Sequence, residues 1–441
     1  MTVLLCLTGC STFSAIAPPV EEAYLLRGAG STLLARALVA GTRCPAMEVD
    51  GASLPMQLRV AAAEVAARPV AQGLTKPARF PLSVCEATLP AAARSARVGS
   101  IALAVPQHAA ERIVIVGDTG CRLKQSDGAF QPCLDSAAWP FAQISRSAAA
   151  LKPDLVIHVG DVHYRESPCP PGQASCAGSA WGFGQDAWSA DLFEPARPLL
   201  RAAPWVFVRG NHESCARAGQ GWFRFLDAAP WTAQRSCDLA RDDAQAAHSA
   251  PFAIAVDAHT QLIVFDSSEQ DDAAAAFQRE FAQINALARP GVQSIFLSHH
   301  PLFGLGLPGK HKAIGPSSKT MLSALAASNA DGLLPSSVTL ALHGHVHLFE
   351  ALGFEAGGTP TFVLGNSGTL ADRGLPEQLP EAALQLGAAR IAAFYTQAGH
   401  GFALLERQQA GWQLTEYARD GRASLVCAVQ GASLSCAATT P

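Results

Sequence analysis

Five short apolar segments of the chain each run directly into polar residues of the kinds that bind metal ions. We expect the segments to be β-strands, because they are four or five residues long and rich in Val, Ile and Leu. The segments and their motifs are Arg112–Val116 with Gly117-Asp118-Thr119-Gly120, Leu155–Val159 with Gly160-Asp161-Val162-His163-Tyr164, Trp205–Val208 with Gly210-Asn211-His212-Glu213, Ile295–Ser298 with His299-His300-Pro301, and Val338–Leu342 with Gly344-His345-Val346-His347. One such motif alone is usually a turn. Five in succession predict a polar site at the carboxyl edge of an α/β sheet.

The segments between and after these strands have helical or further strand character. Helices are expected at Ala274–Ala288 and Lys319–Ala327, where Ala, Leu, Phe and Gln suit an amphipathic face. Helices on both sides explain why the strands are apolar throughout. Further strands are expected at Leu262–Phe265, Thr361–Leu364, Phe402–Glu406, Trp412–Tyr417 and Leu425–Val429. Residues 109–441 are therefore predicted to form one catalytic domain.

Residues 21–108 have a different pattern, with short β-type runs, turn residues and no helical periodicity. The runs are Thr32–Val39, Met56–Val60, Phe80–Val84 and Val98–Val105. This spacing predicts a small all-β, sandwich-like domain that precedes the catalytic domain.

Composition excludes two classes of protein. Hydrophobic residues make up 49% of the 441 residues and charged residues only 15%, which excludes extensive disorder. The net charge is −4 and there is no long basic run, so no nucleic-acid partner is expected.

Residues 1–20 resemble a bacterial lipoprotein signal followed by a tether. A short apolar run ends in Leu7-Thr8-Gly9-Cys10, and a Ser/Pro-containing stretch continues to Pro19. The resemblance implies lipidation of Cys10, export to the bacterial cell envelope, and membrane contact only through this anchor. The alternative is an ordinary apolar terminus, because no Lys or Arg precedes the run.

The other ten cysteines also favour export, since their even number suits five disulfides. The sequence does not determine the connectivity. Pairing in sequential order is the simplest arrangement, and it joins Cys44 with Cys85, Cys121 with Cys133, Cys169 with Cys176, Cys215 with Cys237, and Cys427 with Cys436. A zinc knot is the weaker alternative, because no closely spaced Cys pair occurs among them.

The order of the five motifs resembles that of the calcineurin-like metallophosphoesterases, and within them the purple acid phosphatases. Gly120 stands where the wider superfamily has a His ligand, and Tyr164 completes Gly-Asp-x-x-Tyr, as in the purple acid branch. The preceding β-sandwich is also similar to that branch. The resemblance implies an α/β catalytic domain whose core is a β-sandwich flanked by helices. The chain departs from the family pattern at His299-His300-Pro301 and after His347.

Seven side chains are expected to hold two metal ions, and charge counting and the resemblance assign them alike. Asp118, Asp161, Tyr164 and His347 form a site with three anionic donors that suits Fe(III). Asp161 is shared with a softer site for Zn, Mn or Fe(II), whose other ligands are Asn211, His299 and His345. Two ions ~3.5–4 Å apart can convert water to hydroxide and neutralise phosphate during in-line attack at phosphorus.

Other side chains near the ligands are assigned to the substrate. His212 is expected to protonate the leaving group, and its alternative role is to orient Asn211. Arg122 and His311 are candidate phosphate contacts, with a solvated surface charge as the alternative for Arg122. His300 and His343 are expected to be neighbours of ligands rather than ligands.

These observations predict a binuclear hydrolase of small-molecule phosphate monoesters, similar to an acid phosphatase. One alternative is a phosphodiesterase acting on nucleotides or phospholipid headgroups. The other is a metal-binding envelope lipoprotein without catalysis, which the full set of seven ligands and His212 disfavours.

Overall fold

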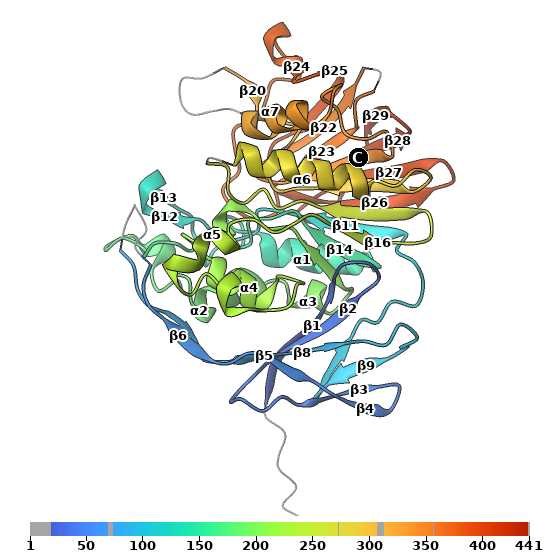
Figure 1. Ribbon diagram of the computed structural model, residues 1–441. Coiled ribbons are helices and arrows are strands. Elements are labelled where there is room, and N and C mark those ends of the chain that lie inside the picture. The colour runs from blue at the N-terminus through green and yellow to red at the C-terminus, as the bar shows by residue number, and fades with distance from the viewer. Residues whose placement is uncertain (1–18, 69–73, 272, 307–312, 356, 440–441) are drawn as a thin grey trace, which may run out of the picture.

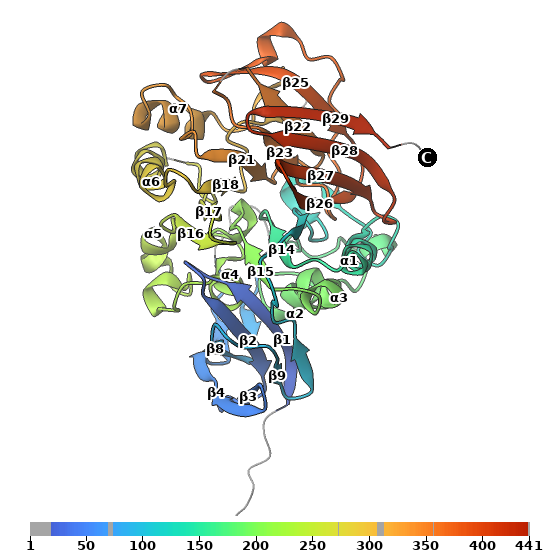
Figure 2. The same ribbon diagram turned by 90° about the vertical axis from the view of Figure 1, so that its right-hand side faces the viewer.

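Two large β-sheets stacked face to face form the body of the protein (Figures 1 and 2). The computed structural model describes residues 19–68, 74–271, 273–306, 313–355 and 357–439. Cys10 and His311 lie outside these residues, so the lipidation of Cys10 stays a prediction. In the described part of the chain, no helix combines the length and apolarity that crossing a bilayer requires.

The first sheet has eleven strands, and its centre is parallel. The central strands are β11 (Arg112–Val116), β14 (Leu155–His158) and β15 (Trp205–Phe207). On one side the sheet continues antiparallel through β26 (Gly401–Gln408), β27 (Gly411–Ala418), β28 (Ala423–Gln430) and β29 (Ser433–Ala438). On the other side it continues through β1 (Val20–Arg27), β2 (Leu33–Val39), β8 (Ser83–Thr88) and β5 (Gln57–Val60).

The second sheet has eight strands and is mixed. In spatial order they are β16 (Phe252–Ala255), β17 (Thr260–Val264), β18 (Gln293–Leu297), β21 (Val338–His343), β23 (Thr361–Leu364), β22 (Phe349–Phe354), β25 (Ala389–Gln397) and β24 (Gln385–Leu386). Strands β17, β18, β21 and β23 are parallel to their neighbours in this group.

Helices cover the outer faces, which gives four layers (Figure 2). Helices α6 (Ala274–Leu287) and α7 (Lys319–Ser328) pack on the second sheet, and α1 (Phe141–Ala150) and α3 (Arg197–Leu200) pack on the first. The space between the sheets is filled by fully buried aliphatic side chains, among them Ile115, Ile157, Leu262, Ile295 and Leu340. Burial on both faces explains the uninterrupted apolar strands. The predicted α/β fold is confirmed, but the expectation of helices on both faces of the strands is wrong, because each sheet has helices on one face and the other sheet on its second face.

The remaining elements are short. They are β6 (Ala63–Val65), β7 (Ala78–Phe80), β12 (Leu123–Lys124), β13 (Ala129–Phe130), β19 (Leu305–Gly306), β20 (Gly315–Pro316), α2 (Gln185–Trp188), α4 (Gly219–Phe225) and α5 (Asp243–Ala246).

The N-terminal region is the expected antiparallel β-structure. A four-stranded sheet of β3 (Ala46–Val49), β4 (Ala52–Pro55), β9 (Ala96–Val98) and β10 (Ile101–Leu103) packs on β1, β2 and β8. The run Val98–Val105 was expected to be one strand, but it contains a hairpin turn because Gly99 adopts a left-handed φ of 57°.

The strand β1 was not predicted, and it joins the N-terminal region to the core. It pairs in parallel with β15 through Leu26 and Trp205, so the first sheet runs without interruption between the two regions. The charged residues of this segment hide its strand character. Glu22 is buried, and Arg197 and Arg201 neutralise its carboxylate. The domain division at residue 108 stays a prediction.

All five disulfides join the cysteines in sequential order, which confirms the simplest connectivity. They indicate that the protein folds in an oxidising compartment outside the cytoplasm.

Candidate metal centre

The five motifs meet where the carboxyl ends of the parallel strands of both sheets come together. Strands β11, β14 and β15 bring the first three motifs, and β18 and β21 bring the histidines. Asp118, Asp161 and His345 adopt left-handed backbone conformations, with φ of 54°, 55° and 71°. Non-glycine residues rarely adopt this conformation, and those that do gather at functional sites.

Tyr164 lies at the centre of one half of the site. Its hydroxyl donates to Asp118 Oδ1 at 2.7 Å, and lies 3.1 Å from Asp161 Oδ2 and 3.0 Å from His347 Nε2. Burial and the Asp118 and Asp161 carboxylates hold the pKa of Tyr164 well above its usual value. Nδ1 of His347 faces the backbone oxygen of Leu370 at 2.9 Å, which turns Nε2 toward the carboxylates.

Asn211 lies at the centre of the other half. Its Oδ1 is 3.1 Å from His299 Nε2 and 3.2 Å from His345 Nδ1. His299 Nε2 is also 3.1 Å from Asp161 Oδ2. Burial opposes protonation of His299, but Asp161 outweighs burial and raises the pKa of His299 to about 9. Asp161 Oδ2 therefore lies next to Tyr164 of the first half and His299 of the second half.

The structure thus brings all seven predicted ligands together, and the chemistry of the donor set fits two cations. The Asp118 and Asp161 carboxylates are buried, and among the described residues their ion-pair partners are histidines only. Buried carboxylates without a fixed positive partner are costly. Metal ions would supply the missing positive charge.

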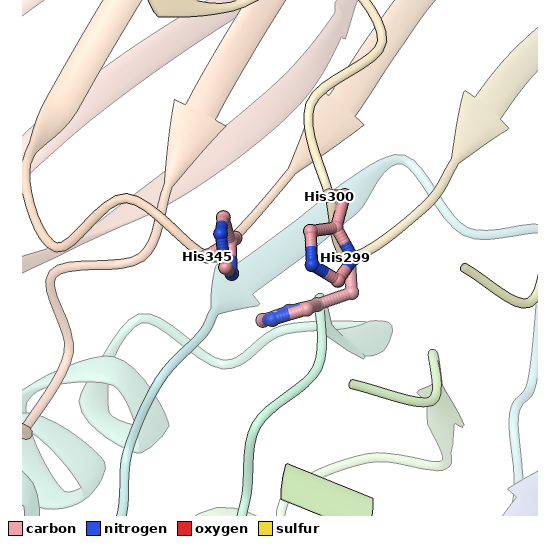
Figure 3. A group of neighbouring side chains, drawn as sticks. All are labelled: His299, His300 and His345. Carbon is pink, nitrogen blue, oxygen red and sulfur yellow. The ribbon is translucent and has the colours of Figure 1, made fainter. Parts of the chain in front are cut away.

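His300 lies beside the proposed ligands, as expected, and also belongs to a group of side chains that could hold a metal ion. One candidate metal-binding group consists of His299, His300 and His345, whose ligand atoms lie within 4.8 Å of one another. Figure 3 shows His299 and His300 reaching from one loop toward His345. The ring centres of His300 and His345 are 4.1 Å apart. The adjacent pair of histidines was the signal in the sequence. His343 instead faces Ser298 Oγ, 2.8 Å from its Nδ1.

His212 lies against Tyr164, with the two ring centres 3.8 Å apart. Its backbone N–H donates to Asp161 Oδ1 at 2.8 Å, and its Nδ1 lies 2.7 Å from Glu166 Oε1. Burial and Arg217 lower the pKa of His212 to about 3, against the opposing effect of the Asp161 and Glu166 carboxylates. The partner Glu166 was not predicted, although it follows Tyr164 by two residues.

Arg122 is beside the site but already has a partner. Its guanidinium is 5.6 Å from the ring centre of Tyr164, and it forms an ion pair with Asp127. The other predicted substrate contact, His311, lies outside the described residues.

Glu213 fixes the loops that carry Asp161 and Asn211. Its carboxylate accepts the backbone N–H groups of Gly210, Asp161, Val162 and His163 at 2.9–3.1 Å. Gly210 is required here, since an added Cβ would lie 2.1 Å from Asp161 Oδ1.

Asp191 connects two further loops, and sequence reasoning missed it. It lies in a π-helical turn (Ser189–Phe193), and its fully buried carboxylate accepts the backbone N–H of Cys121 at 3.0 Å and of Tyr164 at 2.8 Å. Arg165 Nε donates to the same carboxylate at 2.6 Å, and Arg165 is itself only 3% exposed. Asp191 therefore holds the loops of Asp118 and Tyr164 together.

We expect Asp191→Asn to lower the free energy of unfolding by ~3–5 kcal/mol, because it leaves the buried Arg165 guanidinium without a counter-charge. Urea unfolding of the purified protein measures this change. Asp186→Asn is the matched control. It removes a carboxylate five residues away that pairs with Lys76 at the surface, so its effect should stay within ~1 kcal/mol. Equal effects of the two substitutions would contradict the role given to Asp191.

Comparison with known proteins defines the class of this protein. Residues 111–349 match the calcineurin-like phosphoesterase family, and because they are more than half of the chain, the chain belongs to that family. The predicted resemblance is confirmed.

Solved structures show the same fold. The purple acid phosphatase PPD1 from yellow lupin (Lupinus luteus) seeds is 15% identical with a TM-score of 0.56, and the match covers 92% of this chain and 73% of that one. PhoD is 11% identical with a TM-score of 0.55, covering 96% of this chain and 94% of that one. No protein with a curated function matches the sequence.

Proposed function

We propose that the protein is a binuclear metal-dependent hydrolase of phosphate monoesters. The observation that carries this proposal is the convergence of seven donor side chains on two adjoining positions. The proposed ligands are Asp118, Asp161, Tyr164 and His347 at one position, and Asp161, Asn211, His299 and His345 at the other. His300 lies close enough to the second position to serve there as an additional ligand.

The donor types favour different ions at the two positions. Two carboxylates and a phenolate suit Fe(III), whereas an amide and imidazoles suit Zn, Mn or Fe(II). Bound ions supply a nucleophile from water and neutralise the oxygens of phosphate.

His212 is the proposed general acid. The Glu166 carboxylate behind Nδ1 favours a proton on that nitrogen and orients the ring, which leaves Nε2 to exchange a proton with the substrate. A phosphate dianion near Nε2 favours the charged imidazolium, because an opposite charge nearby raises a histidine pKa. The proton then passes to the leaving oxygen.

Metal analysis combined with two substrates tests the function. We expect about two metal ions per chain, and faster hydrolysis of 4-nitrophenyl phosphate than of bis(4-nitrophenyl) phosphate. Faster hydrolysis of the diester would make the protein a phosphodiesterase. Full metal occupancy without turnover of either ester would favour a metal-binding protein without catalysis.

Tyr164→Phe should remove a colour. A phenolate bound to Fe(III) gives a charge-transfer band, so the iron-loaded wild type should be purple or pink and the variant colourless, as measured by visible absorption. Tyr395→Phe, on β25, is the matched control and should keep the band. A colourless wild type that contains stoichiometric Fe(III) would contradict ligation by Tyr164.

We also propose that the protein is exported to the bacterial cell envelope and carries a lipid on Cys10. The wild type should partition into the detergent phase of a Triton X-114 extract, and Cys10→Ala should stay in the aqueous phase. Mass spectrometry of the membrane fraction checks the same point, because an unmodified Cys10 there would refute lipidation.

A further inference from the structure

A cavity separate from the candidate metal centre lies where the N-terminal β-region meets the core. Its volume is about 830 Å³, and none of the proposed metal ligands lines it. The turn that follows β1 and the segment that leads into β16 form two of its walls, and a β-bridge between Gly30 and Ile254 connects these segments. Figure 2 shows β1 and β2 ending beside β16. This volume is within the ~300–1,000 Å³ range of small-molecule sites.

The walls of the cavity are largely apolar. Leu34, Ala228, Ala250, Pro251 and Phe252 supply much of the surface. The carboxylate of Glu86 at the rim is neutralised by Arg36 at 2.7 Å and Arg59 at 3.3 Å, so it does not repel an anion. The other carboxylate of the wall, Asp227, has the guanidinium of Arg235 3.5 Å away.

A small recess adjoins the cavity. The recess has a volume of about 30 Å³ and shares Asp227, Ala228, Ser249, Ala250 and Phe252 with the cavity. Its other lining residues include Arg27, Trp205, Trp222, Arg209 and Asp266. A space of this size accommodates one or two oxygen atoms of a head group.

Arg27 is the unusual residue of the recess. Among the described residues its side chain has no hydrogen-bond or ion-pair partner, and its Nε is buried. Partial burial lowers the pKa of Arg27. Arg27 is partly exposed, so water reaches part of its side chain, but its buried Nε lacks a hydrogen bond that an acidic ligand would supply.

The other charged residues of the recess are already paired. Arg209 lies 3.4 Å from Asp266 within the recess, and Asp227 lies 3.5 Å from Arg235, which lines the larger cavity. Among the described residues, Arg27 is therefore the charged residue of the recess that has no ion-pair partner.

We propose that this cavity binds a small amphiphilic anion, with the acidic head group on Arg27 and the apolar body against Leu34, Ala250 and Phe252. The site is independent of the proposed phosphatase activity, since it uses none of the residues of the metal centre.

Isothermal titration calorimetry with probes that share one alkyl chain tests the proposal. The probes are decane-1-sulfonate, 1-decanol and decyltrimethylammonium, all below their aggregation concentrations. We expect one sulfonate to bind per full-length chain. Its affinity should be at least ~10-fold higher than that of either other probe, because a hydrogen bond to a charged group contributes at least that factor to affinity. Failure of the sulfonate to bind, or equal affinity for decanol, would overturn the proposal.

Arg27→Met keeps the length of the side chain and removes its charge. We expect sulfonate affinity to fall by ~10-fold or more, whereas Arg43→Met, at an exposed arginine, should leave it unchanged. Without ligand, Arg27→Met should raise the melting temperature, because an unpaired charge is lost. A lower melting temperature, or unchanged sulfonate affinity, would show that Arg27 has another role and would overturn the assignment.

Ala250→Trp tests whether the sulfonate binds in the cavity, independently of the charge of Arg27. Ala250 is exposed in the cavity wall, so a large side chain there should fill the space without disturbing the core. Sulfonate binding should be lost while the melting temperature stays near that of the wild type. Unchanged binding would place the sulfonate elsewhere.

Discussion

Asp161→Asn will remove metal from both positions of the centre and lower phosphatase activity by more than ~100-fold. Asp161 Oδ2 is 3.1 Å from Tyr164 Oη on one side and 3.1 Å from His299 Nε2 on the other. The substitution removes a charge that two cations would share. Mutation of a residue that only supports a metal ligand typically lowers metal affinity or activity by ~10–100-fold. We therefore expect the loss of a shared ligand to lower activity by more than this.

Metal content per chain, measured by mass spectrometry of the purified protein, and activity on 4-nitrophenyl phosphate test this expectation. An asparagine oxygen can still accept the backbone N–H of His212 that Asp161 Oδ1 now accepts, so the loop should keep its conformation. Asp154→Asn, just before the amino end of β14, is the control and should retain both ions. Loss of a single ion would show that Asp161 belongs to one position only.

The arrangement of the ligands could be predicted because it depends on short-range sequence. Each ligand motif follows its strand directly, and parallel strands place their carboxyl ends at one edge. Asp118, Asp161 and Asn211 therefore had to lie close together once β11, β14 and β15 were recognised. The disulfides are a similar case, since four of the five close loops of 7–22 residues.

The supports of the ligands could not be predicted, because they depend on contacts between distant segments. Asp191 accepts a hydrogen bond from Cys121, 70 residues earlier, and its own segment has no motif. Glu166 is adjacent to a motif, yet its contact with His212 appears only when two loops are folded together. Strand β1 was missed for the same reason, since the arginines that neutralise Glu22 lie 175 and 179 residues later.

The site also depends on residues that hold its loops in place. Asp191 and Glu213 each accept several backbone N–H groups at once, and one of those bound to Glu213 belongs to Asp161, whose backbone is left-handed. The proposed metal ligands alone therefore do not define the candidate centre.

His212→Ala should keep both metals and the fold but lower kcat by ~10²–10⁴-fold, the usual contribution of a positioned general acid. The loss should be largest for alkyl phosphates and smaller for 4-nitrophenyl phosphate, because nitrophenolate leaves with little need of a proton. Comparing kcat for the two ester types in wild type and variant measures this difference. An equal loss for both leaving groups would contradict proton donation by His212.

Glu166→Gln separates the proton donor from a histidine that merely supports Asn211. If Glu166 acts by orienting and charging His212 through the 2.7 Å contact with Nδ1, Glu166→Gln should lower kcat for alkyl phosphates in the wild-type background. The same substitution should have little further effect in the His212→Ala background, since two residues that act as one unit are not additive. Metal content should stay at two ions in all three variants. If His212→Ala instead loses metal in proportion to activity, His212 holds a ligand in place, and the proton must come from another group.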